Sequence, residues 1–201
     1  MASTPLVFLS SYQAPDSRLN ATLQAWLPVL LCSSIFVIES TATFGADHTS
    51  APLHNLCQLL IGTAVDRDWS NIHHIIRKTG HFTGYGTFSL VCFRGFWLSL
   101  RKWASRIHAG LTSGLARQCA SHVLAIAATF LVAGADELHQ SFLPNRTGLF
   151  SDVLLDTTGA LTLQVLLFLI LGAIALWRKS PANSADSEDR SEPQRRLPRA
   201  A

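Results

Sequence analysis

The feature that most constrains this chain is residues 153–177, a long apolar segment whose single charged residue is Asp156. About 20 helical residues cross the ~30 Å hydrocarbon core of a bilayer, so this segment is long enough to span a membrane. Residues 23–44 and 81–100 are similar, and residues 119–135 reach the required length if "DELHQSF" continues their helix. We therefore predict an all-α, polytopic membrane protein, folded as a bundle of about four transmembrane helices.

The composition agrees with a membrane setting. Hydrophobic residues make up 48% of the chain, charged residues only 14%, and the mean hydropathy is +0.26. A soluble domain carries about 25% charged residues. The four cysteines have no paired or metal-type spacing, so they predict neither a disulfide framework nor a thiolate zinc site. We expect the lipid bilayer as a partner, and neither a cofactor nor a nucleic acid.

The distribution of Lys and Arg predicts the orientation, because these residues are enriched in cytoplasmic loops. One basic residue precedes the first predicted span, four lie between the second and third spans, and six follow the fourth, so eleven share one side. Three lie between the first and second spans and one between the third and fourth, so the other side has four. We predict a cytoplasmic N-terminal segment (1–22), a transmembrane domain (23–177) and a disordered, polar cytoplasmic tail (178–201).

In this topology two polar clusters fall on the outer side of the membrane. The first, "HHIIRKTGHFTGYG" at residues 73–86, leads into the second span, and "DELHQSFLPNRTGLFSDVLLD" at residues 136–156 joins the third and fourth spans. Glu39, near the outer end of the first span, is expected to join them or to reach the lipid headgroups. Within the connection 45–72, "APLHNLCQLLIG" is too short to cross, so it should lie at the interface or enter as a re-entrant turn.

Helical spacing arranges the first cluster. Arg77, His81 and Tyr85 stand four residues apart and therefore share one helix face. Gly80 and Gly84 form a pair of small residues at the same spacing, which lets a neighbouring helix approach closely. The sequence thus predicts polar side chains beside a site of close helix packing.

The second cluster reads as a helix end, a turn and a helix start. Asp136 shares a helix face with His139 and Gln140, and "LPNRTG" is typical of a turn. Ser151 is the predicted N-cap of the last span, with Asp152 in its positive first turn.

Asp156 lies one turn deeper in the last span. A lone carboxylate inside the bilayer costs about 2–3 kcal/mol on insertion scales, so Asp156 should face the bundle and find a partner. The candidates are Arg146, Arg77 and His81. We predict that spans two, three and four converge at their outer ends. The residues expected around the shared cavity are His81, Asp136, Glu137, Arg146 and Asp156.

These two clusters resemble the VanZ-like family of bacterial membrane proteins. "RKTGHFTGYG" followed by "ADELHQSFLPNRTGLFSDVLLDTTGA" has the family's motifs in the right order, and the resemblance covers roughly residues 26–177. The matching positions are Arg77, Lys78, His81, Phe82, Tyr85, Asp136, Glu137, Gln140, Phe142, Arg146, Asp152, Asp156 and Gly159. The chain departs from the pattern at Asn145, where Gly is usual, and at Asp156, where Asn is common.

The resemblance implies a bacterial cell-membrane protein of the cell envelope. The family is named after a protein linked to resistance against the glycopeptide antibiotic teicoplanin, so a role in antibiotic resistance or envelope homeostasis is implied as well. It supplies no biochemical activity.

Three roles stay open for the clustered residues. They can form a purely structural network of ion pairs and helix caps in an interaction protein. They can bind an anionic lipid or a lipid-linked cell-wall precursor, with Arg77, Lys78 and Arg146 holding phosphate. The full set of binding candidates is Arg77, Lys78, His81, Tyr85, Asp136, Glu137, Gln140, Arg146, Asp152 and Asp156.

The third role is catalytic. His81 or His139 could act as a general base that Asp136, Glu137 or Asp156 orients, on a lipid-linked or phosphate-containing envelope substrate. A nucleophile motif such as GxSxG is missing, so the sequence leaves open whether the protein is an enzyme. Neither does the sequence contain the HExxH spacing of a zinc site, and we expect no metal at His81, His139, Asp136 and Glu137.

The predicted topology can be tested by labelling single cysteines in a cysteine-free background. We expect a membrane-impermeant thiol reagent to label Thr147→Cys but not Arg190→Cys in intact cells, because the loop after the third span lies outside. Permeabilised cells should label both positions. Labelling of position 190 but not of 147 in intact cells would reverse the orientation.

Overall fold

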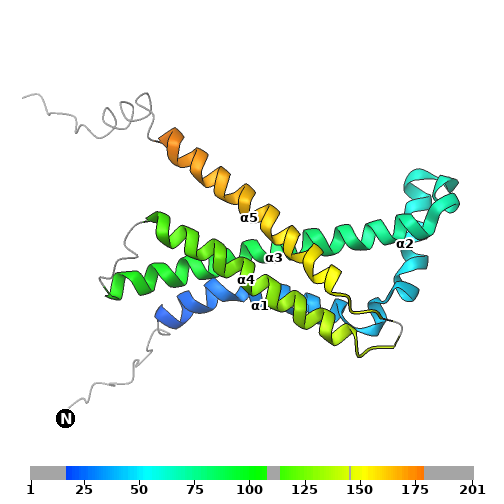
Figure 1. Cartoon of the computed structure of the whole chain (residues 1–201), viewed down its shortest axis with the longest axis horizontal. Coiled ribbons are helices and arrows are strands. Elements are labelled where there is room, and N and C mark those ends of the chain that lie inside the picture. The colour runs from blue at the N-terminus through cyan, green and yellow to red at the C-terminus, as the bar shows by residue number, and fades with distance from the viewer. Residues whose placement is uncertain (1–16, 108–113, 145, 179–201) are drawn as a thin grey trace, which may run out of the picture.

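The structure, a computed structural model, describes residues 17–107, 114–144 and 146–178 (Figure 1). In this part of the chain every regular element is a helix. The elements are α1 (Ser17–Glu39), η1 (Ala42–Phe44), α2 (Ala46–Ile61), η2 (Thr63–Asp68), α3 (Trp69–Ile107), α4 (Gly114–Gln140) and α5 (Phe150–Arg178). The predicted all-α class is confirmed. Residues 1–16 of the predicted N-terminal segment and 179–201 of the predicted tail lie outside the described residues.

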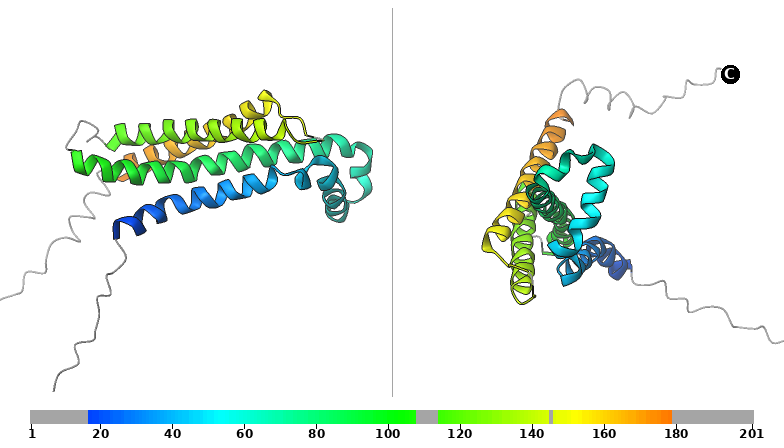
Figure 2. Two further views of the ribbon diagram at one scale, coloured as in Figure 1. Left: turned by 90° about the horizontal axis from the view of Figure 1, so that it is seen from below. Right: turned by 90° about the vertical axis from the view of Figure 1, so that its right-hand side faces the viewer.

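Four long helices form the bundle, with α3 at its centre. α3 contacts α1, α4 and α5, and α4 also contacts α5. Figure 2 shows α1, α3 and α4 side by side, while α5 crosses them and α2 lies beyond one end of the bundle. We call this end, where α2, the start of α3, the end of α4 and the start of α5 meet, the α2 end.

The long helices fit a membrane. α1 (from Asn20), α4 and α5 are each long and apolar enough to cross one. α3 contains the predicted second span but is more polar, and its 39 residues extend for about 58 Å, well beyond the hydrocarbon core. The large apolar side chains that α1, α4 and α5 leave exposed have the positions expected of lipid contacts.

Two predicted helix ends are wrong by a few residues for one physical reason. α1 ends at Glu39 rather than at residue 44. α4 continues through "DELHQ" as predicted but ends at Gln140, before Ser141 and Phe142. Just after each end, a hydroxyl donates to a carbonyl three residues back: Thr41 to Ile38 at 2.7 Å, and Ser141 to Leu138 at 2.6 Å. Such bonds compete with the continuing helix.

The connection between α1 and α3 is a helical hairpin rather than a loop. α2 has 16 residues, too few to cross a bilayer. Its last turn exposes Leu59, Leu60 and Ile61 at 82%, 73% and 68%. An apolar edge on a short helix beside a membrane-spanning bundle favours the interfacial position over a re-entrant one.

Small residues bring the helices together. Along α4 the buried positions recur every four residues: Ser121, Ala125, Thr129, Ala133 and then Glu137. This spacing makes a narrow stripe of small side chains on the face towards α3 and α5, as is typical of membrane bundles.

The closest approach is between α3 and α5, and it differs from the predicted one. A Cβ on Gly159 would lie 2.1 Å from the backbone oxygen of Phe82, and a Cβ on Gly86 would lie 3.1 Å from the oxygen of Gly159. The prediction of close packing at Gly80 and Gly84 is wrong, because a Cβ at Gly80 would meet nothing within 4 Å and one at Gly84 only the ring of Phe36 at 3.6 Å. α5 packs against the face of α3 that contains Phe82 and Gly86 instead.

We expect Gly159→Ala to destabilise the bundle by about 1–3 kcal/mol, because the added methyl group would overlap a backbone atom that cannot rotate away. Thermal unfolding of the detergent-solubilised protein measures this. Gly172→Ala, in the same helix, is the matched control, since a Cβ there meets nothing within 4 Å. Equal unfolding temperatures for the two variants would contradict the packing.

Candidate functional site

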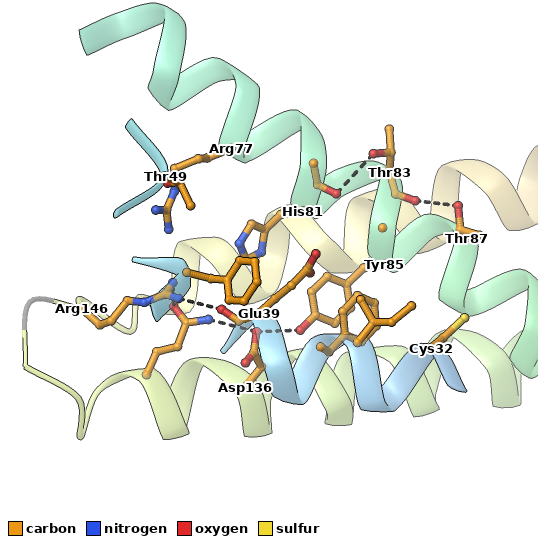
Figure 3. Close-up of a pocket in the computed structure, with 16 residues that line it drawn as sticks. Cys32, Glu39, Thr49, Arg77, His81, Thr83, Tyr85, Thr87, Asp136 and Arg146 are labelled. Carbon is orange, nitrogen blue, oxygen red and sulfur yellow. Dashed lines mark hydrogen bonds between the residues drawn. The ribbon is translucent and has the colours of Figure 1, made fainter. Parts of the chain in front are cut away.

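A cavity of about 460 Å³ lies at the α2 end of the bundle (Figure 3). Its walls come from α1, η1, α2, α3, the end of α4 and the turn that follows α4. These segments are far apart in the sequence. The second, third and fourth predicted spans do converge at this end, where His81 of α3 faces Asp156 of α5 and Glu137 of α4 accepts the N–H of Leu149. The prediction that five residues surround one cavity is only partly right: His81, Asp136 and Arg146 line it, but Glu137 and Asp156 do not.

Two arginines face one end of this cavity. Arg77 reaches it from the first turns of α3 and Arg146 from the turn after α4, and Figure 3 shows both guanidinium groups pointing into the same space. Neither forms an ion pair with a carboxylate in the described part of the chain. Both have a buried nitrogen without a hydrogen-bond partner, Nη1 of Arg77 and Nε of Arg146. The cavity therefore contains donors that folding leaves unused.

The two cations also affect each other. Arg77 lies before the predicted second span, and burial together with the positive charge of Arg146 lowers the pKa of its guanidinium, while Asp152 and Asp47 act in the opposite direction. An anion bound between Arg77 and Arg146 would offset the repulsion between the two guanidinium groups and stabilise the charged form of Arg77.

A chain of hydrogen bonds fixes the floor of the cavity. Arg146 donates to Gln140 Oε1 at 3.3 Å, Gln140 Nε2 donates to Asp136 Oδ2 at 3.0 Å, and Tyr85 Oη donates to the same Asp136 oxygen at 2.8 Å. The bond from Arg146 to Gln140 uses its Nη1, and its second terminal nitrogen, Nη2, donates to the backbone oxygens of Glu39 at 2.7 Å and Thr41 at 2.8 Å. Arg146 thus ties the turn to the end of α1.

The opposite wall is apolar. It includes Ile35 and Phe36 of α1 and Phe44 of η1, and the ring of Phe36 stacks on Tyr85 with centroids 4.3 Å apart. Glu39, for which the sequence predicted either the clusters or the lipid headgroups, also lines the cavity. The apolar wall itself was not predicted, although the helical spacing of Phe36 and Glu39 could have indicated a common face.

A second group lies where α3, α4 and α5 meet. His81 Nδ1 is 3.4 Å from Asp156 Oδ2, so among the three candidate partners of Asp156 the structure selects His81. Donor atoms of His81, Glu137 and Asp156 all lie within 4.8 Å of one another. Asp156 is fully buried and Glu137 is 5% exposed. This set has the chemistry of a metal site or of a general base oriented by a carboxylate.

Glu137 also holds the start of α5. Its Oε2 accepts the backbone N–H of Leu149 at 2.9 Å, the residue just before the helix. The prediction that Ser151 caps this helix is wrong, because Ser151 lies inside it and a buried carboxylate from α4 takes that role. Gly148 permits this contact, since a Cβ there would lie 2.0 Å from the backbone oxygen of Glu137.

Two candidates from the sequence point elsewhere. Lys78 pairs with Asp152 and does not line the cavity. His139 Nδ1 lies 2.7 Å from Ser40 Oγ, so it joins α4 to the end of α1 and takes no part in the group with His81. The structure therefore divides the predicted residues among a cavity, a buried His–carboxylate group and an ion pair.

Comparison with known proteins shows the family of this chain. No curated protein and no solved structure matches the chain. The model of the VanZ/LLP1 family matches residues 8–176, a range that contains α1 to α5 almost completely and all of the cavity. Because the match covers most of the chain, this membrane protein belongs to the VanZ/LLP1 family.

Proposed function

We propose that the protein binds an anionic lipid, or a lipid-linked component of the cell envelope, with its phosphate group in the cavity. The observation that carries this proposal is the pair Arg77 and Arg146, two guanidinium groups that face one cavity without a carboxylate partner. Arg binds phosphate oxygens in a bidentate manner, with bonds stronger than those between neutral groups.

The energetics favour a ligand over a structural role for these arginines. Bringing two like charges into a partly buried site is unfavourable, and folding alone would pair each with a carboxylate. Carboxylates are available nearby in Asp136 and Glu137, yet they accept hydrogen bonds from Tyr85, Gln140 and the backbone instead. Unpaired charges at a concave site are typical of binding sites.

The shape of the cavity supports an amphipathic ligand. Arg77 and Arg146 provide an end for a headgroup, while Phe36, Ile35 and Phe44 provide an apolar wall for an alkyl chain. Basic pockets between spans are a known way to hold lipid headgroups.

The predicted topology places this cavity on the outer side of a bacterial cell membrane, with a multi-pass chain and both termini in the cytoplasm. There it would meet components of the outer leaflet and of the growing cell wall. Through such a ligand the protein would act in envelope homeostasis, or in resistance to teicoplanin-type glycopeptides.

We expect Arg77→Gln and Arg146→Gln each to weaken the binding of phosphatidylglycerol at least tenfold. A lost charge-assisted hydrogen bond costs about 1.5–3 kcal/mol, and 1.4 kcal/mol is tenfold in affinity. Binding can be measured by native mass spectrometry or by quenching of a labelled lipid in nanodiscs, with phosphatidylcholine as the reference lipid. Removing the Arg77 charge should leave the unfolding temperature unchanged or raise it.

Arg94→Gln is the matched control. Arg94 donates to the backbone oxygens of Gln24 and Ala25 in α1, at 2.9 and 3.2 Å, much as Arg146 does at the other end of that helix, but it does not line the cavity. The Arg94→Gln variant should unfold at a lower temperature but bind phosphatidylglycerol as the wild type does. If the cavity variants unfold more easily and bind lipid as the wild type does, the arginines are structural and the proposal fails.

A second candidate function, hydrolysis or group transfer on a phosphate-containing lipid, is favoured by His81. This residue lines the cavity and its Nδ1 faces the buried Asp156 at 3.4 Å, an arrangement suited to a general base. If the protein is such an enzyme, His81→Gln should retain lipid binding within about twofold and lose turnover by at least about 100-fold. Unchanged turnover of a lipid diphosphate in the His81 variant would exclude this function.

A further inference from the structure

We propose that His81, Glu137 and Asp156 bind a divalent transition-metal ion, Zn²⁺ or Mn²⁺, between α3, α4 and α5. The site adjoins the cavity but uses different residues from the proposed phosphate contacts Arg77 and Arg146. It therefore stands independently of the proposed function.

The geometry brings an imidazole and two carboxylates close together. One donor atom from each residue lies within 4.8 Å of the other two, so small rotations of the side chains can place all three around one ion. Each residue sits on a different helix, and the close approach of Gly159 to Phe82 fixes the relative position of α3 and α5 beside the site. Ligands on rigid elements are held more precisely than ligands on loops.

The buried carboxylates of Glu137 and Asp156 would be stabilised by a cation. Asp156 is fully buried, its Oδ2 faces His81, and its Oδ1 has no hydrogen-bond partner. Neither Glu137 nor Asp156 forms an ion pair with a Lys or Arg among the described residues. An unpartnered buried carboxylate oxygen is costly, and a metal ion would satisfy it while neutralising both carboxylates.

The donor set selects the class of metal. Imidazole nitrogen suits Zn²⁺ and other first-row transition ions, whereas Mg²⁺ and Ca²⁺ prefer oxygen ligands alone. The backbone N–H of Leu149, 2.9 Å from Glu137 Oε2, would orient that carboxylate as outer groups do in metal sites.

Three protein ligands leave at least one coordination position open. His81 is the member of the set that also lines the cavity. If the proposed function holds, a phosphate oxygen of the bound lipid is the natural further ligand, and the ion would link that phosphate to the buried carboxylates.

The test uses the full chain, purified in detergent with a tag that contains no histidine. The protein is stripped with EDTA, titrated separately with ZnCl₂, MnCl₂ and MgCl₂, and dialysed, and the metal content is measured by mass spectrometry. We expect about one Zn²⁺ or Mn²⁺ per chain, together with a raised unfolding temperature that EDTA reverses. Asp156→Asn and Glu137→Gln should each reduce the bound metal at least about tenfold.

Asp66→Asn is the matched control. Asp66 Oδ1 pairs with His54 Nε2 at 2.8 Å on the surface of the hairpin, and among the described residues no third His, Cys, Asp or Glu joins them as a possible metal ligand. This variant should therefore keep the bound metal. Arg77→Gln should also keep it even if lipid binding is lost, which separates the two proposals.

Three results would overturn the proposal. These results are no uptake of Zn²⁺ or Mn²⁺ by the stripped wild type, uptake of Mg²⁺ as readily as of either ion, and retention of the full metal content by the Asp156→Asn and Glu137→Gln variants. If Asp156→Asn does not fold, the wild type decides by itself: an unfolding temperature that neither Zn²⁺ nor Mn²⁺ raises excludes the site.

Discussion

The contact on which the candidate site depends is the approach of α5 to α3 at Gly159. A Cβ at this position would lie 2.1 Å from the backbone oxygen of Phe82, so only glycine permits the crossing. Phe82 follows His81 in the sequence, and Asp156 lies about one helical turn before Gly159. The crossing therefore places a buried carboxylate next to an imidazole, so the position of Asp156 inside the bundle depends on the close packing of α5 against α3.

Apart from the ion pair of Lys78 with Asp152, the acidic and basic side chains at the α2 end lie in separate groups. Glu137 and Asp156 gather with His81 where three helices meet, while Arg77 and Arg146 face the cavity. Ion pairing would have joined the two groups if stability alone had arranged them. Instead, Gln140 and Asp136 connect Arg146 to Tyr85 by hydrogen bonds and hold the groups apart. The two arginines are therefore able to attract an anion, and the group of His81 with two carboxylates is able to attract a cation.

Much of this was predictable because membrane helices have strong local signals. The apolar stretches predicted the helices, and the cost of Asp156 in lipid predicted that it would face a partner. The details depended on tertiary geometry. His81 rather than an arginine meets Asp156, Glu137 rather than Ser151 caps α5, and Gly159 rather than Gly80 makes the close contact. Local spacing cannot rank candidates on different helices, since their rotations about the helix axes are set only by packing.

The middle of the bundle shows how this chain builds polar contacts that serve structure. Buried Gln164 of α5 donates to the backbone oxygen of Ser89 at 2.8 Å, and its Oε1 lies 2.5 Å from His122 Nδ1 of α4. This network joins α3, α4 and α5 with amide, imidazole and hydroxyl groups and uses no Asp, Glu, Lys or Arg. Helix association in lipid needs no more than this. The four acidic and three basic residues in segments 73–86 and 136–156 at the α2 end exceed that need. The contrast within one bundle favours a ligand, rather than packing, as the reason for the charges there. The acidic residues are Asp136, Glu137, Asp152 and Asp156, and the basic ones are Arg77, Lys78 and Arg146.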